Sequence, residues 1–218
     1  MWAGAAGASD ALAGDWTGYA SIASDRIYRG VSLLDSGPAL QGGIEGVFED
    51  RFVVGATVAN IDHQWLYEYR VPQHVELNLY GGIDLACGAN CRLRALVTGY
   101  VFPGPKARDW QEASVSVAFA ERVGATVSWG PDGYGSGNST RAVEAWFAQP
   151  LTRLTSVEID AGEVWLGSRD YWYSRAGVSH RIDRWVFALS RYWSDPNYAR
   201  FGFDDRSRRY VVSISMAF

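Results

Sequence analysis

Hydrophobic and polar residues alternate with a period of two along most of the chain. The last stretch, 208–218, places large apolar side chains on one face: Tyr210, Val212, Ile214, Met216 and Phe218. The other face carries small and mostly polar residues. A period of two predicts β-strands, because successive side chains of a strand point to opposite faces. We expect the apolar face to point outward and the polar face to line an interior.

The alternation recurs in about twelve segments that are separated by turn signals. The predicted strands are 16–25, 38–49, 51–60, 74–84, 92–102, 110–120, 123–130, 140–148, 154–165, 172–181, 184–194 and 208–218. Neither a helical heptad nor a second domain is apparent. The pattern predicts an all-β fold, an up-and-down antiparallel β-barrel over 15–218. The Ala/Gly-rich segment 1–14 is expected to be a flexible N-terminal leader.

Short and long connections alternate strictly between these segments. The short ones lie near Asp50, Cys87 to Cys91, Glu121, Gln149 to Arg153, and Asp183. The long ones are 26–37, 61–73, 103–109, 131–139, 166–171 and 195–207. Alternate connections of an up-and-down sheet lie on opposite rims. Short turns on one rim and long loops on the other are typical of outer-membrane barrels, whose short turns are periplasmic.

Aromatic residues gather near the strand ends, as in the two interfacial girdles of membrane proteins. Those expected toward the short turns are Trp16, Phe48, Phe52, Phe119, Phe147, Trp185 and Phe218. Those expected toward the long loops are Trp65, Phe102, Trp110, Trp129, Trp165, Trp172 and Trp193. A soluble sandwich or lipocalin-like barrel is the alternative, but it has no reason to place Trp at both strand ends.

No stretch of the sequence is long enough for a transmembrane helix. The longest run without Asp, Glu, Lys or Arg is 95–105, far short of the roughly 20 apolar residues that a helical span needs. A chain of this kind can span a membrane only as a closed barrel. We therefore predict a transmembrane β-barrel in the outer membrane of a Gram-negative bacterium, with membrane lipid as a partner.

The charge distribution argues against a nucleic-acid partner. The net charge is −4, and basic residues cluster only at Arg206, Arg208 and Arg209. That cluster fits a solvated strand end better than a phosphate site.

The two cysteines, Cys87 and Cys91, flank a Gly/Asn turn. A disulfide there fits an oxidising compartment such as the periplasm. The alternative, a metal pair, would need further ligands, and the nearest histidine, His74, lies across a strand. No metal and no cofactor is expected.

One motif near the start resembles a known family. It reads Ser24-Asp25 and then Arg29-Gly30-Val31-Ser32, followed by Pro38, Gln41, Gly42 and Gly43. This spacing resembles the opening of the TorF family of proteobacterial porins, and it covers only the first fifth of the chain. The resemblance implies an outer-membrane β-barrel of porin type.

Candidate site residues follow from the polar face and from this motif. Arg29 could pair with Asp25 or with Glu45 and so fold the first loop over the mouth, either as a constriction that filters solutes or as a loop anchor. The expected pore-lining residues are Asp25, Arg29, Glu45, Glu76, Asp84, Arg94, Glu112, Glu144, Glu158, Asp160, Arg175 and Arg181. The strand phase at Arg141 and Arg191 stays open, because a slip of one residue exchanges the faces.

These features predict a narrow porin-like channel for passive diffusion of small solutes. A barrel of about twelve strands lies between filled and open barrels, and an excess of acid favours cations or neutral solutes. One alternative is a structural or docking barrel with a closed lumen, whose loop 195–207 plugs the mouth or binds a surface partner. The other is a barrel hydrolase with His63 beside Asp62, although no Gly-x-Ser-x-Gly motif is present. A homo-oligomer is a separate alternative for the assembly of the barrel.

Overall fold

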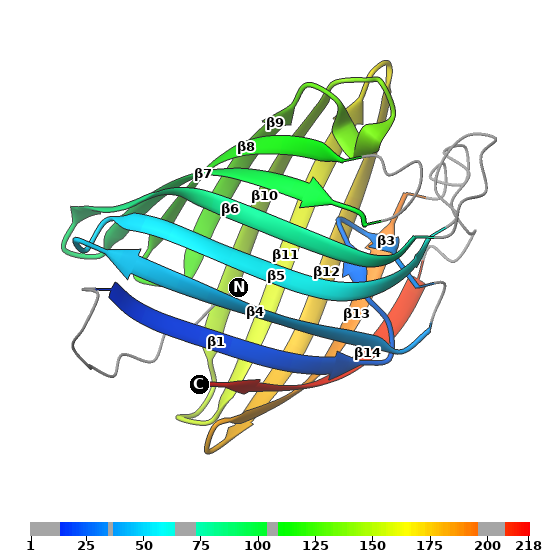
Figure 1. Cartoon of the computed structure of the whole chain (residues 1–218). Coiled ribbons are helices and arrows are strands. Elements are labelled where there is room, and N and C mark those ends of the chain that lie inside the picture. The colour runs from blue at the N-terminus through cyan, green and yellow to red at the C-terminus, as the bar shows by residue number, and fades with distance from the viewer. Residues whose placement is uncertain (1–13, 35–36, 64–72, 104–108, 196–207) are drawn as a thin grey trace.

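Twelve strands of the computed structural model close into a single antiparallel barrel (Figure 1). The structure describes residues 14–34, 37–63, 73–103, 109–195 and 208–218. The barrel strands are β1 (Gly14–Ala23), β4 (Ala39–Phe48), β5 (Phe52–His63), β6 (Gln73–Gly88), β7 (Cys91–Val101), β8 (Trp110–Phe119), β9 (Val123–Gly130), β10 (Thr140–Pro150), β11 (Thr155–Leu166), β12 (Arg169–Ile182), β13 (Trp185–Ser194) and β14 (Arg208–Ala217). The predicted all-β up-and-down barrel is confirmed.

Each strand pairs with its sequence neighbours, and the first and last strands close the barrel. β1 pairs with β4 from Gly14–Phe48 to Ala23–Ala39, and with β14 from Tyr19–Ala217 to Ala23–Ser213. Reciprocal backbone hydrogen bonds join Gly18 and Phe218 at 2.7 and 2.9 Å. Every strand of the barrel thus has a partner on both sides, which leaves no free edge in the barrel sheet that the structure describes.

Three short elements lie outside the barrel wall in the described ranges. These are β2 (Ile27–Tyr28) and β3 (Val31–Ser32), which pair with each other, and the 3₁₀ turn η1 (Gly133–Gly135). Figure 1 shows β2 and β3 at the end of the barrel opposite the β4–β5 turn. Across the described part of the chain, no helix combines the length and apolar character that a membrane crossing requires.

Apolar side chains cover the outside of the barrel at alternate positions. Val115, Val127 and Val143 lie in one cross-strand row of β8, β9 and β10, and each is about half exposed. Residues of the opposite strand parity, such as Glu112 of β8 and Ser128 of β9, are buried toward the interior. The apolar face therefore points outward, as the alternation predicts.

The short connections are tight hairpin turns. Glu49-Asp50 and Ala120-Glu121 have positive φ at both central positions, as in type I′ turns, which match the strand twist. The predicted long loop 166–171 is wrong: β11 and β12 extend to Leu166 and Arg169, and only Gly167 and Ser168 connect them. Gly167 adopts a φ of +61°, which lets the chain reverse there.

The disulfide and most of the aromatic placements agree with the sequence. Cys87 and Cys91 are bonded across the β6–β7 turn, with 5.0 Å between their Cα atoms, so the predicted disulfide is confirmed. The predicted place of Trp110 in the loop-end girdle is wrong, because its side chain is only 5% exposed. It has the same strand parity as Glu112 and therefore faces inward. Phe102 also packs against a buried cluster, and Trp65 lies outside the described residues.

Candidate functional site

The first long connection forms a β-hairpin that reaches into the barrel. Ile27 pairs with Ser32 and Tyr28 with Val31, which leaves Arg29 and Gly30 as the two turn residues. Their φ angles are 48° and 80°, as a type I′ turn requires. A Cβ on Gly30 would lie 2.6 Å from the Cβ of Tyr173 on β12. Only glycine allows the hairpin tip to approach this wall so closely.

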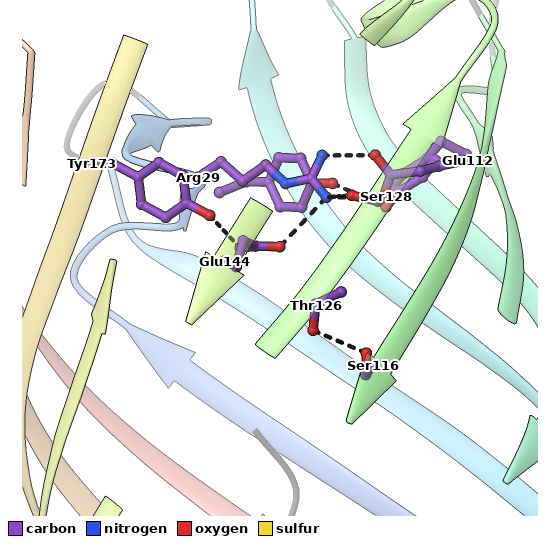
Figure 2. A network of polar contacts seen from close by, with 9 residues as sticks. Arg29, Glu112, Ser116, Thr126, Ser128, Glu144 and Tyr173 are labelled. Carbon is purple, nitrogen blue, oxygen red and sulfur yellow. Dashed lines mark hydrogen bonds and ion pairs between the residues drawn. The ribbon is translucent and has the colours of Figure 1, made fainter. Parts of the chain in front are cut away.

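The Arg29 side chain extends from the hairpin tip into a carboxylate pocket (Figure 2). Its two terminal nitrogens donate to the two oxygens of Glu112 at 2.7 and 2.9 Å, and one of them also donates to Ser128 at 2.7 Å. Glu144 lies on the other side at 3.5 Å. The side chains of Arg29 and Glu112 are 3% and 6% exposed. This is a buried bidentate ion pair, the strongest geometry available to a guanidinium and a carboxylate.

Asp25 and Glu45 are therefore not the partners of Arg29, which corrects the predicted pairing. The hairpin carries Arg29 toward β8, β9 and β10 and away from β1 and β4. Asp25 instead accepts from Arg209 of β14 at 2.8 Å and from the Ser32 hydroxyl at 2.8 Å. These contacts fix the base of the hairpin to the last strand.

Arg26 fixes the same base to another wall. Its guanidinium donates to Glu76 of β6 at 2.6 Å, and Asn78 donates to the same carboxylate oxygen at 2.8 Å. Ion pairs from one hairpin thus reach β6, β8, β10 and β14. These ion pairs hold the hairpin in a fixed position in the barrel interior.

Apolar and aromatic side chains pack the hairpin as well. The buried cluster at the loop end consists of Val31, Leu33, Ile61, Ala142, Val164, Leu166, Tyr171 and Tyr173. Beside it, the hydroxyls of Tyr28 and Tyr100 lie 3.0 Å apart, and Trp110 stacks on Tyr100 with ring centroids 3.7 Å apart. The sequence reasoning missed this packing. The Arg-Gly pair between two short alternating segments is the signal that could have revealed the hairpin.

The charge states of the hairpin follow from its burial. Burial raises the pKa of the Tyr28 phenol well above its ordinary value, although nearby Arg29 opposes this. Burial alone would lower the pKa of Arg29, but the acidic groups around it, the phenols of Tyr28 and Tyr134 and the Glu112 carboxylate, raise it instead. At neutral pH the tyrosine is uncharged and the arginine is cationic, so the Arg29–Glu112 contact is a charge-assisted one.

A second set of interior ion pairs lies nearer the short turns. Glu45 of β4 pairs with Arg94 of β7 and accepts a hydrogen bond from Tyr80 at 3.0 Å. Asp84 of β6 pairs with Arg92 at 3.1 Å. These contacts join β4, β6 and β7 through their inward side chains.

A third set lies on β11 and β12. Arg175 donates to Glu158 at 2.8 Å and also binds Asp160, so one guanidinium serves two carboxylates. Glu144 accepts a hydrogen bond from Tyr173, beside the Arg29 pocket. Arg181 shares the inward parity of Arg175 but is exposed at the short-turn end of β12.

The two arginines whose strand phase was open lie on the outer face. Arg141 of β10 lies opposite Trp129 of β9 and Trp165 of β11 in the strand register. Arg191 of β13 packs over the rings of Trp193 and Tyr210, at 4.8 and 5.2 Å from their centroids. Both belong to the outward set, and neither lines the interior.

The features that a hydrolase or a metal site would need are sparse. The side chains of Asp62 and His63 lie outside the described residues. His74 is exposed, and His180 shares a hydrogen bond of 2.9 Å with Thr155. Among the residues whose positions the structure describes, no group of three His, Cys, Asp or Glu side chains could hold a metal ion. Residues 196–207 of the loop expected to plug the mouth or to bind a surface partner lie outside the described ranges.

A closed antiparallel barrel with an apolar outer face and a polar interior is the architecture of outer-membrane barrel proteins. The chain belongs to the family described as "Bacterial protein of unknown function (Gcw_chp)", whose profile matches residues 7–216. This finding supplies a different family name from that of the TorF resemblance. Among curated proteins, none matches the sequence.

Solved structures with the same fold are outer-membrane porins and channels. The NanC porin has a TM-score of 0.61 at 6% identity, covering 92% of this chain and 98% of its own. The KdgM porin has a TM-score of 0.55 at 7% identity, covering 93% and 99%. An outer membrane channel from Pseudomonas putida F1 has a TM-score of 0.51 at 11% identity, covering 95% and 96%. At these identities the likeness concerns the fold.

Proposed function

We propose that this protein is a non-catalytic, porin-like channel in the outer membrane of a Gram-negative bacterium, through which small solutes diffuse passively. The observation that carries the proposal is the combination of a closed barrel, an apolar outer face and an ion-paired interior. The porins of the same fold support it, as does the TorF-like motif. The KdgM porin was also solved in complex with disordered oligogalacturonate, which supports solute binding as the use of such a barrel.

The exposed apolar side chains of the outer face support a membrane location. Leu40, Ile44, Val58 and Leu79 are each about half exposed on neighbouring strands. Burying apolar surface stabilises by about 25 cal/mol per Å², and a continuous apolar belt of this kind indicates a membrane or protein interface. Membrane lipid would cover the exposed apolar side chains around the whole circumference of the barrel. In this orientation the short turns and the disulfide face the periplasm.

The hairpin is the proposed constriction. Asp25 and Arg29 hold it across the interior through contacts with β14, β8 and β10. These residues therefore act as anchors for the hairpin, and the hairpin narrows the path. A solute would pass beside it rather than displace it, since the Arg29–Glu112 pair is buried.

The interior charges support a mild preference for cations or neutral solutes. Every carboxylate of the proposed lining takes part in an ion pair. However, Arg29 serves both Glu112 and Glu144, and Arg175 serves both Glu158 and Asp160. Each of these two groups keeps one negative charge in excess. Carboxylates along a path favour cations over anions.

Planar-bilayer recording of the purified barrel tests the proposal. We expect small single-channel steps and a reversal potential in a KCl gradient that indicates weak cation selectivity. A barrel that inserts but conducts no ions would contradict the channel. It would favour the second candidate, a structural or docking barrel with a closed lumen. The packing of Tyr28, Tyr100, Trp110 and Tyr134 across the loop end supports that candidate.

A further inference from the structure

The outer face of the barrel carries a groove near the loop end, over β8, β9, β10 and β11. It has a volume of about 770 Å³. The residues that give it its character are Ala113, Val115, Val127, Trp129, Arg141 and Trp165. A groove of this size accommodates a small ligand or part of a larger one.

The strand register explains its shape. One cross-strand row reads Ala113, Trp129, Arg141 and Trp165 on consecutive strands. Side chains directly opposite each other on one face of a sheet lie within about 5.5 Å at Cβ. The row therefore places a cation between two large rings, with the small Ala113 beside them. The next row is aliphatic and is formed by Val115, Val127 and Val143.

Arg141 is available to a ligand. It is exposed, and no hydrogen bond, ion pair or ring contact joins it to any residue that the structure describes. By register, the nearest outward carboxylates are Glu163, opposite Val143, and Asp170, opposite Trp165. Arg191 on the same outer face differs from Arg141, because its guanidinium already packs over the rings of Trp193 and Tyr210.

We propose that this groove, with Arg141 between Trp129 and Trp165, binds a lipid with a net anionic headgroup from the membrane leaflet at the loop end. The proposal rests on the proposed membrane location. Tryptophan favours the membrane–water interface, and a guanidinium at that level faces headgroup phosphates, to which it can donate two hydrogen bonds. The aliphatic row beneath it is in the place of the acyl chain. Charge complementarity thus selects an anionic lipid as the occupant.

The test is native mass spectrometry of the full barrel released from neutral detergent. The protein is titrated with phosphatidylglycerol or with phosphatidylcholine that has the same acyl chains. We expect the wild-type barrel to retain phosphatidylglycerol about fivefold better, the preference typical of one basic residue at a membrane surface. Arg141→Gln should abolish the preference, and Arg141→Lys should restore part of it. Inorganic phosphate should not compete, since it lacks the apolar part.

Arg153→Gln is the matched control, because it removes the same charge from an exposed turn at the opposite rim. It should leave the preference intact. Equal retention of the two lipids by the wild type, an unchanged preference in Arg141→Gln, or an equal loss in Arg153→Gln would each overturn the site. Competition by inorganic phosphate would overturn the lipid assignment in favour of a simple anion site. Circular dichroism checks that the variants fold.

The same experiment separates this inference from the channel proposal. Arg141→Gln should conduct like the wild type in planar bilayers, because Arg141 lies on the outer wall. If neither lipid is retained but single-channel steps are recorded, the lipid site fails and the channel proposal stands. If lipid selectivity is present but no ions pass, the channel proposal fails and the lipid site stands.

Discussion

Arg29 and Glu112 lie 83 residues apart in the sequence, and both oxygens of the carboxylate accept hydrogen bonds from the guanidinium, at 2.7 and 2.9 Å. The arginine is the tip of a hairpin from the first loop, and the carboxylate belongs to the wall of β8. Their contact turns a surface loop into a fixed part of the barrel interior.

Replacing Arg29 with Gln should lower the free energy of unfolding by about 3–5 kcal/mol, because it leaves Glu112 buried without its partner. Arg29→Lys should be less damaging, since lysine keeps the charge but cannot bind both oxygens. Urea unfolding in detergent or vesicles measures both. The double variant Arg29→Gln with Glu112→Gln should recover part of the loss. Additive effects of the two substitutions would show that the pair is not coupled.

Gly30→Ala should destabilise the hairpin more than Gly137→Ala does. The two glycines have φ angles of +80° and +79°, so alanine costs both about 1 kcal/mol of backbone strain. Only at Gly30 would the new Cβ meet Tyr173, at 2.6 Å, while nothing lies within 4 Å at Gly137. The overlap should add roughly 1–3 kcal/mol. Equal effects of the two substitutions on unfolding would mean that the tip is not pressed against β12.

Asp160→Asn should shift the reversal potential away from cation selectivity. The substitution leaves Arg175 paired with Glu158 alone and removes the excess negative charge of this group. The matched control is Asp183→Asn, which removes a carboxylate from the exposed β12–β13 turn. A salt gradient across a planar bilayer gives the measurement. If both variants shift selectivity alike, the rim and not the lumen sets the preference.

Removing the disulfide with Cys87→Ser and Cys91→Ser should lower the stability by about 2 kcal/mol, as the loop entropy of so short a closure suggests. Conductance should not change, because the cysteines lie in a turn at the short-turn rim and outside the interior ion pairs. Thermal unfolding with and without reductant tests the first expectation, and single-channel recording tests the second. A change in conductance would place this turn in the permeation path.

The alternation of apolar and polar residues was enough to predict the strands, their facing and the barrel. This succeeds because side-chain direction in a strand depends only on local parity. It also places Glu112, Glu144 and Asp160 inside. Which charges meet across the interior depends on barrel closure and on the path of the first loop, which no local pattern contains. The pairing of Arg29 was therefore mistaken.

The remaining errors have local causes. The aromatic type of Trp110 and its place at a strand end predict an outer girdle, although its parity with Glu112 indicates the interior. The predicted strands end at Trp165 and begin again at Trp172, which makes the β11–β12 connection too long. In the structure both strands continue past the apolar belt and meet in a tight turn. At both places the direction of the side chain and the length of the strand follow from strand parity and strand extension, and not from residue type.

The junction between β1 and β14 has a mechanical consequence. Its register runs from Tyr19–Ala217 to Ala23–Ser213, with further backbone hydrogen bonds between Gly18 and Phe218 and from Ser24 to Val212, whereas β1 and β4 are paired along the whole length of β1. β1 therefore has fewer paired residues with β14 than with β4. Under mechanical force the barrel should therefore open first between β1 and β14. During folding the barrel can close only after these two strands, which are the most distant in the sequence, have paired.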